Sequence, residues 1–227
     1  LLRDAFGGEW TEAAGRLNLG PDQAPVPGGG EASEACLRLE QAMGGRIPTP
    51  ETSSLGRIFD GVAALVGLRR RVSFEGQAAM ELEALAKGRT GLHLPFAVTD
   101  GGGDVRTPPP QGGPEIRTLD LRPAVRTIVG ALTEGRPREE IALAFHNLLP
   151  EAFTAMANIL RRETGLKRVV LSGGCFQNRL LLSGCLDCLR KADFEVFYHR
   201  LVPTNDGGIS LGQAVCAGAR HPKGVTA

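Results

Sequence analysis

Apolar residues recur along much of this chain at the three- and four-residue spacing typical of amphipathic helices. Within 52–68, for example, Ile58, Val62, Leu65 and Val66 form one stripe, and Ser53 or Ser54 precedes it as a candidate N-cap. The first helical stretch is interrupted by Gly7 and Gly8, which predicts a pair of short helices. The pattern predicts helices over 1–20, 31–44, 52–68, 75–87, 121–134 and 137–165.

Short apolar runs bounded by turn residues predict strands at 91–98 and 115–120, and again nearer the end of the chain. There the order is strand, helix, strand, turn and helix, which is typical of an α/β layered fold with its loops gathered at one edge of the sheet. These last elements are expected at 167–174, 175–192, 194–201, 203–208 and 209–219.

Two segments rich in proline and glycine, 21–30 and 100–113, predict loops. The first of them favours a division into a helical N-terminal segment, 1–50, and a larger domain, 51–227. The chain begins with Leu1 inside a predicted helix, so we expect it to be a fragment of a longer polypeptide.

Charge and composition narrow the possible functions. Hydrophobic residues make up 42% of the chain, and its 26 basic and 25 acidic residues leave a formal net charge of +1. That balance favours neither nucleic acid nor an anionic membrane as a partner. No apolar run approaches the roughly 18 residues that span a bilayer, and no secretory signal pattern opens the chain. We therefore expect a cytoplasmic protein. The basic cluster Arg69–Arg71 is either a helix cap or a phosphate site.

The cysteines and histidines give little support for a metal centre. An odd number of cysteines without a signal peptide favours reduced thiols. Cys185 and Cys188 form a C-x-x-C inside a predicted helix without a second pair, and Cys175 is expected to pack as a small residue. His146 is expected in a core or between lobes. The five cysteines are at 36, 175, 185, 188 and 216, and the four histidines, which lack ligand spacing, are at 93, 146, 199 and 221.

Two glycine turns follow the last two predicted strands. Ser172-Gly173-Gly174 is either a tight strand-to-helix turn or a place where the backbone approaches an anion. In Asn205-Asp206-Gly207-Gly208, Asp206 is either a helix cap or a ligand of a divalent cation. Since both turns follow strands of one sheet, we expect them to meet across a single pocket that takes an adenylate.

Three further positions have two interpretations each. Asp60 lies in a predicted helix among apolar and small residues, where a carboxylate needs a partner, or else lies on the surface. Glu75 and Gly76 stand at the start of the next helix. Glu75 either accepts hydrogen bonds from a sugar diol or complements the helix dipole.

Several stretches together resemble the C-terminal region of the hydrogenase-maturation carbamoyltransferases of the HypF family. These are TSSLGRIFDGVAALVGL, SFEGQAAMELEALA, IALAFHNLL, VVLSGGCFQNRLLL and HRLVPTNDGGISLGQA, and they cover most of 50–220 in the same order. The resemblance implies one lobe of a two-lobed, actin-like ATPase fold of the ribonuclease H-like type, with additional helices. Its nucleotide-binding core would be 167–219.

The resemblance also implies an activity and its residues. Such a domain transfers a carbamoyl group from carbamoyl-adenylate to the C-terminal cysteine of a partner, HypE, and that group becomes a cyanide ligand of [NiFe]-hydrogenase. Asp60, Glu75 and Gly76 would hold the ribose. Gly173, Gly174 and Asn178 would hold the adenine and phosphate side. Asp206 would be one ligand of a divalent metal (Fe, Zn or Mg) that bridges the phosphates.

The sequence departs from the family pattern in ways that predict an incomplete enzyme. The histidine pair that supplies the family's other metal ligands is absent, as are the acylphosphatase-like, zinc-binding and adenylate-forming domains. We therefore expect the isolated chain not to catalyse the complete reaction. Two alternatives remain open: an enzyme of the tRNA threonylcarbamoyl-adenosine type with the same fold, or a non-catalytic lobe that binds nucleotide or docks a partner.

Overall fold

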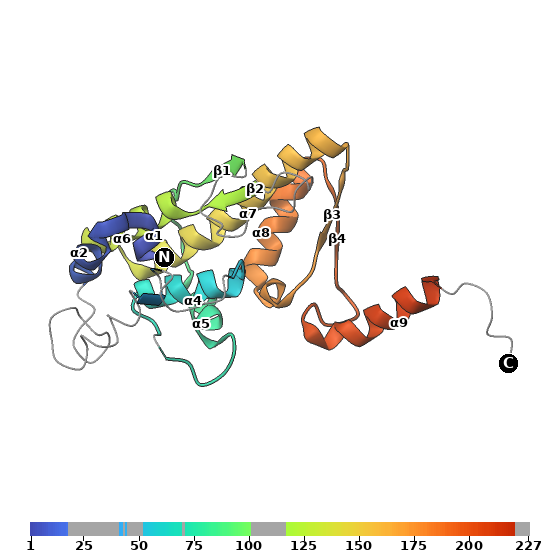
Figure 1. Ribbon diagram of the computed structural model, residues 1–227, viewed down its shortest axis with the longest axis horizontal. Coiled ribbons are helices and arrows are strands. Elements are labelled where there is room, and N and C mark those ends of the chain that lie inside the picture. Colours follow the sequence, from blue (N-terminus) through green and yellow to red (C-terminus); the bar gives the residue numbers. More distant parts are fainter. Residues whose placement is uncertain (18–40, 43, 45–51, 70, 101–116, 221–227) are drawn as a thin grey trace, which may run out of the picture. The chain divides into compact units, whose positions relative to one another are not determined.

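The computed structural model describes residues 1–17, 41–42, 44, 52–69, 71–100 and 117–220 (Figure 1). The chain divides into two compact units, Leu1–Leu148 and Leu149–Ala227, and the boundary falls within one long helix, α7. The predicted loop at 21–30, nearly all of the predicted helix at 31–44, and Cys36 and His221 lie outside the described residues.

The first unit is mainly helical, and its predicted helices at 52–68, 75–87 and 121–134 are confirmed. The helical prediction for 1–20 is confirmed within the described residues 1–17. Gly7 and Gly8 begin a short 3-10 helix that separates the first two helices, as expected. Its elements are α1 (Leu2–Phe6), η1 (Gly7–Glu9), α2 (Trp10–Arg16), α4 (Leu55–Leu65), α5 (Gln77–Leu85), β1 (Ala97–Asp100), β2 (Arg117–Asp120), α6 (Arg122–Thr133) and the start of α7 (Arg138–Thr164).

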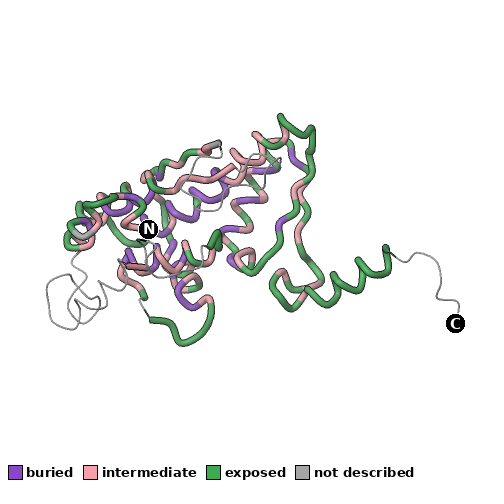
Figure 2. The backbone as a smooth tube through the Cα atoms, in the orientation of Figure 1, coloured by how far each residue is buried: buried purple, intermediate pink, exposed green. Residues whose placement is uncertain are grey.

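The core of this unit comes from the apolar stripes of α4, α5, α6 and α7 (Figure 2). α4 packs on α5, and the Phe59 ring meets the Phe145 ring edge-on with centroids 5.1 Å apart. His146 is buried beside them, its ring centroid 5.5 Å from that of Phe59, so its predicted core position is confirmed. Aromatic edge contacts of this kind add to the free energy gained from apolar burial.

The predicted strand at 91–98 has the wrong bounds. The strand β1 begins only at Ala97 and pairs antiparallel with β2, from Ala97 opposite Asp120 to Asp100 opposite Arg117. The preceding residues include Pro95, which has no N–H to donate to a ladder. The strand prediction for 91–96 therefore followed from the apolar residues there, and these residues do not pair with a strand.

The predicted helix at 137–165 is confirmed as α7, which continues through Pro150. A proline inside a helix removes one backbone hydrogen bond. One turn later, the Thr154 hydroxyl donates to the Pro150 carbonyl oxygen at 2.8 Å.

The second unit contains a parallel strand pair joined by a crossover helix. Its elements after α7 are β3 (Arg168–Leu171), η2 (Gly174–Gln177), α8 (Arg179–Lys191), β4 (Glu195–Tyr198), η3 (Asp206–Gly208) and α9 (Ile209–Arg220). β3 and β4 pair in parallel, with Val170 opposite Phe197. Parallel neighbours require such a crossover. α8 buries Leu181, Cys185 and Leu189, which are spaced at four residues along its inner face.

α8 is also held to the C-terminal half of α7. The Arg161 guanidinium donates to the Ala192 carbonyl oxygen at 2.8 Å and lies over the Phe194 ring, 4.3 Å from its centroid. Among the described residues, none of the helices is both long and apolar enough to cross a bilayer.

Candidate functional site

The two glycine turns of the second unit are bonded directly to each other. The Gly173 N–H donates to the Thr204 carbonyl oxygen at 2.9 Å, and the Thr204 hydroxyl donates to the Gly173 carbonyl oxygen at 3.2 Å. Both turns follow the carboxyl ends of parallel strands, the usual ligand side of an open α/β sheet. Their predicted proximity is confirmed.

Two glycines make this contact possible. Gly173 has φ 109° and ψ 158°, a backbone conformation that is essentially restricted to glycine. A Cβ on Gly208 would lie 2.6 Å from the Pro203 carbonyl oxygen, so the second turn closes only without a side chain there. Gly174 differs, because a Cβ there would meet Asn205 at an ordinary 3.9 Å.

The first turn does not open directly into α8, which corrects the helix predicted from residue 175. The 3-10 helix η2 intervenes, and α8 begins after Asn178, whose side-chain oxygen accepts a hydrogen bond from the Leu181 N–H at 2.9 Å. Asn178 is 9% exposed. This residue, predicted to bind nucleotide, is therefore also the N-cap of α8.

In the second turn, Asn205 takes the capping role that sequence alone left open for Asp206. The Asn205 side-chain oxygen accepts from the Gly207 N–H at 3.1 Å, and its carbonyl oxygen accepts from the Gly208 N–H at 3.0 Å. Asp206 is exposed, and its carboxylate has no hydrogen bond or ion pair to the described residues. The carboxylate thus remains available to a ligand.

A link between the strand ends was missed at the level of sequence. The hydroxyl of Ser172 and Nε2 of His199 share a hydrogen bond of 2.9 Å, which joins the residues that follow β3 and β4. Both residues directly follow strands that the sequence predicted to be neighbours. Each residue comes one position after the end of its strand, and this matching position could have indicated that the two side chains meet.

The prediction that the turns face each other across an adenylate-sized pocket needs correction. The turns touch, and the pocket beside them has a volume of about 80 Å³. Ligand pockets usually have volumes of about 300–1,000 Å³. The pocket is lined by Leu171, Phe176, Leu182, Tyr198, His199, Val202 and Thr204.

The other predicted binding residues belong to the first unit. Asp60 is half-buried in α4 and pairs with Arg57 one turn earlier, with 3.1 Å between Nη1 and Oδ2. Glu75 is exposed, and Gly76 is the N-cap residue of α5 with φ 78°. The left-handed conformation of Gly76 favours glycine at this turn.

The described residues do not make up a metal site. No group of three or more His, Cys, Asp or Glu side chains with suitable spacing occurs in the described part of the chain. Burial raises the pKa of the Cys185 thiol to about 12, and burial also raises that of Cys188. Since thiolates are the metal-binding form, neither cysteine is prepared for a metal. Asp206 alone could contribute one ligand.

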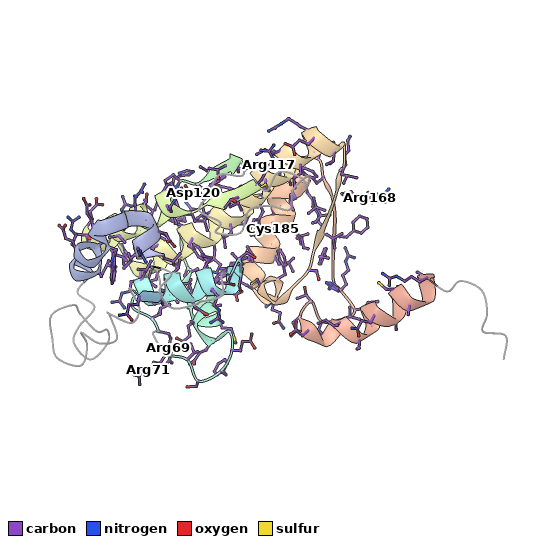
Figure 3. All side chains as sticks on the ribbon, in the orientation of Figure 1. Arg69, Arg71, Arg117, Asp120, Arg168 and Cys185 are labelled. Atoms are coloured by element: carbon purple, nitrogen blue, oxygen red, sulfur yellow. The ribbon has the colours of Figure 1, made fainter. Side chains whose placement is uncertain are left out.

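Within the basic cluster Arg69–Arg71, Arg69 has a partner that the sequence did not indicate. The Nε atom of Arg69 lies 2.8 Å from Oε2 of Glu81, in an ion pair between the α4–α5 connection and α5. Arg69 and Arg71 are labelled in Figure 3. Arg71 is exposed on the same connection.

Comparisons with known proteins show which family the chain belongs to. The family model "Carbamoyltransferase, Kae1-like Domain, second subdomain" matches residues 13–213. HypF of Rhizobium leguminosarum bv. viciae is 37% identical over 207 residues, covering 91% of this chain and 24% of the relative. A HypF homolog of Cupriavidus necator is 32% identical, covering 96% of this chain and 54% of that protein.

Two solved structures share the fold. A full-length HypF in a phosphate- and nucleotide-bound form has a TM-score of 0.75 at 35% identity, covering 99% of this chain and 27% of that one. HypF of T. kodakarensis has a TM-score of 0.70 at 28% identity, covering 91% and 25%. The expected α/β, actin-like fold class is confirmed, and the chain spans about a quarter of the length of these HypF proteins. This chain therefore belongs to the HypF carbamoyltransferase family, within which it matches the second subdomain of the Kae1-like domain.

Proposed function

We propose that this chain forms the nucleotide-binding part of an ATP-dependent carbamoyltransferase that modifies the C-terminal cysteine of a HypE-type protein. The carbamoyl donor is carbamoyl-adenylate, and the product is the precursor of a cyanide ligand of [NiFe]-hydrogenase. The observation that carries this proposal is the direct bonding of Gly173 to Thr204. This bonding brings the backbone of Gly173 and Gly174 to the same edge of the sheet as the turn that carries the unpaired Asp206 carboxylate.

The phosphate side of the donor is assigned to the two joined turns. The Gly174 N–H donates to no group in the described residues, and Gly174 has no Cβ that would keep a phosphate away. Gly173 shapes this turn, and Asn178 holds the start of α8 behind it.

The proposed reaction is acyl transfer. The thiolate of the acceptor cysteine attacks the carbamoyl carbon, a C–S bond forms, and the bond from that carbon to the bridging oxygen of the adenylate breaks. AMP leaves with that oxygen. Backbone N–H groups such as that of Gly174 would stabilise the charge on the leaving phosphate. This chain then supplies binding and electrostatic stabilisation, and none of its own cysteines forms a covalent intermediate.

Asp206 is proposed as one ligand of a divalent cation, in keeping with its exposed, unpaired carboxylate. A single carboxylate does not hold a cation on its own, so its other ligands would have to come from outside the described residues. For the same reason we assign no step of the reaction to the metal, and we expect no carbamoyl-dependent ATP cleavage by the isolated chain.

The test uses glycine positions that differ in what an added methyl group would meet. Gly174→Ala is accommodated by the fold, since beyond its own chain neighbours the added Cβ would meet only Cβ of Asn205, at 3.9 Å. The methyl group would nevertheless occupy the place where a phosphate approaches. AMP affinity, measured by calorimetry with and without divalent cation, should fall about tenfold or more, as expected from the loss of a charge-assisted hydrogen bond. Gly212→Ala in α9, where the added Cβ would meet no atom beyond the backbone of its own helix within 4 Å, is the matched control.

Transfer itself is tested in a chimera in which this chain replaces the matching segment of the Rhizobium leguminosarum HypF. Mass spectrometry of the acceptor's C-terminal peptide should detect the carbamoylated cysteine, and Asp206→Asn should abolish it while also lowering the bound metal. AMP binding with no transfer by the chimera would contradict the catalytic proposal and support a docking lobe. Unchanged metal content in Asp206→Asn would remove Asp206 from the metal site.

A further inference from the structure

The last helix, α9, combines an apolar composition with complete exposure. Within Ile209–Arg220 only Ser210, Gln213 and Arg220 carry polar side chains. A helix that is apolar around most of its circumference is normally buried. Every residue of α9 is nevertheless exposed (Figure 2). The described residues therefore do not supply the surface against which such a helix packs.

The apolar residues of α9 form one broad face. Leu211 and Val215 are four positions apart, so they are neighbours on one side of the helix, and they are 51% and 64% exposed. The polar residues 210, 213 and 220 share the other side with Ala217, since all four are spaced at three or four positions. We define the α9 apolar face as Leu211, Val215 and the small residues around them, Gly212, Ala214, Cys216, Gly218 and Ala219.

The strand pair of the same unit also has an uncovered apolar face. Parallel sheets are normally buried on both faces. Leu171 and Tyr198 face α8, because they line one pocket together with Leu182 of that helix. Val170 and Phe197 lie opposite each other in the register and, by the alternation of a strand, on the other face of the sheet. They are 69% and 45% exposed, so the second unit needs a further apolar layer.

A further part of the same protein is the occupant that fits this surface. The chain matches a second subdomain, and it covers only 27% of the full-length HypF structure. That match covers 99% of this chain, so it includes α9. Arg220 is the only charged residue of α9, which fits an apolar protein surface. Helices that lie on a membrane surface are instead rich in Lys and Arg on their polar face.

We propose that α9 is a docking helix whose apolar face packs against the first subdomain of the Kae1-like domain in the longer protein. This inference goes beyond the proposed function and does not depend on it. η3, which carries Asp206, leads directly into α9, and the preceding Thr204 is bonded to Gly173. A subdomain seated on α9 therefore lies next to the two joined turns.

The experiment measures how fast Cys216 reacts with N-ethylmaleimide, with peptide mapping by mass spectrometry to separate the cysteines. Cys216 is exposed on α9 and should react readily in the isolated chain. In the chimera with the Rhizobium leguminosarum HypF it should react about tenfold more slowly or less, a change that corresponds to about 1.4 kcal/mol. Cys185, which is 0% exposed, should stay unreactive in both proteins and shows that the second unit is folded. Equal reactivity of Cys216 in the two proteins would overturn the proposal.

Two glutamate substitutions on opposite sides of α9 are the matched variants, because glutamate preserves helix propensity. In the chimera, Val215→Glu should restore the fast reaction of Cys216, whereas Ala217→Glu on the polar side should not. In the isolated chain, neither substitution should change the urea midpoint, as is usual for surface positions.

Two other occupants of the α9 apolar face give different results. A lower urea midpoint of the isolated chain in Val215→Glu alone would show that the face is already covered within this chain. Protection of Cys216 that increases with the concentration of the isolated chain would assign the face to a second copy. Either result would overturn docking of the first subdomain, and neither measurement requires a nucleotide.

Discussion

Gly173 and Thr204 are joined by two hydrogen bonds, one from the Gly173 N–H to the Thr204 carbonyl oxygen and one from the Thr204 hydroxyl back to the Gly173 carbonyl oxygen. The residues are 31 positions apart, and the loops that carry them follow β3 and β4. Such reciprocal bonding makes the two turns one structural feature. A distortion of either turn should therefore change the structure of the other turn as well.

Gly208→Ala should distort the second turn, because its Cβ would lie 2.6 Å from a backbone oxygen, that of Pro203, which has no side-chain freedom to move. We expect a loss of about 1–3 kcal/mol in unfolding free energy, the usual range for overpacking. Urea denaturation measures the loss, with Gly212→Ala as the control in open space. Equal stability of the two variants would show that the turn relaxes without cost.

Gly184→Ala should weaken the packing of α8 on α7, since its Cβ would lie 2.7 Å from Cγ of Pro150. Overpacking costs about 1–3 kcal/mol, and alanine regains up to about 1 kcal/mol of helix propensity, so the variant should be less stable than wild type by up to about 2 kcal/mol. Gly130→Ala in α6, where the added Cβ would meet no atom beyond the backbone of its own helix within 4 Å, should instead gain stability. Thermal denaturation compares the two, and adding Pro150→Ala should rescue Gly184→Ala if the ring is the obstacle.

Two substitutions at Asn178 should distinguish its role as the N-cap of α8 from its proposed role in ligand binding. Asn178→Ala removes the acceptor for the Leu181 N–H and should cost about 1 kcal/mol of stability. Asn178→Asp keeps an acceptor of equal capping strength but adds a negative charge next to the proposed phosphate position. We expect it to retain stability in urea and to bind AMP more weakly in calorimetry. Full AMP affinity in Asn178→Asp would restrict Asn178 to its structural role.

His146 should make stability depend on pH. Burial lowers its pKa from the ordinary 6.5, so below pH 6.5 the unfolded chain binds a proton that the folded chain does not. Stability should therefore decrease as the pH falls below 6.5, toward the lower pKa of the folded state. His146→Phe should flatten this part of the stability profile, measured by urea denaturation between about pH 7.5 and 5. His93→Gln, at an exposed histidine, should leave the slope in place.

The helices were determined largely by the sequence itself. The stripes that predicted 52–68, 121–134 and 137–165 became α4, α6 and α7, because a helix buries residues that are three and four positions apart along one segment. The glycine turns, the parallel order of the last two strands and the family motifs were also visible in local sequence. Pro150 did not mislead the prediction, since the apolar stripe continues beyond it.

Only the tertiary structure decided which distant groups meet. The contact of Gly173 with Thr204, the choice of Glu81 as the partner of Arg69, and the use of Asn178 as a cap depend on groups brought together by strand pairing and helix packing. The start of β1 at Ala97 likewise depends on where β2 supplies partners. The periodicity of a segment specifies which face each of its residues occupies. A hydrogen bond between distant segments depends also on where the second segment lies, and the local sequence does not contain that information.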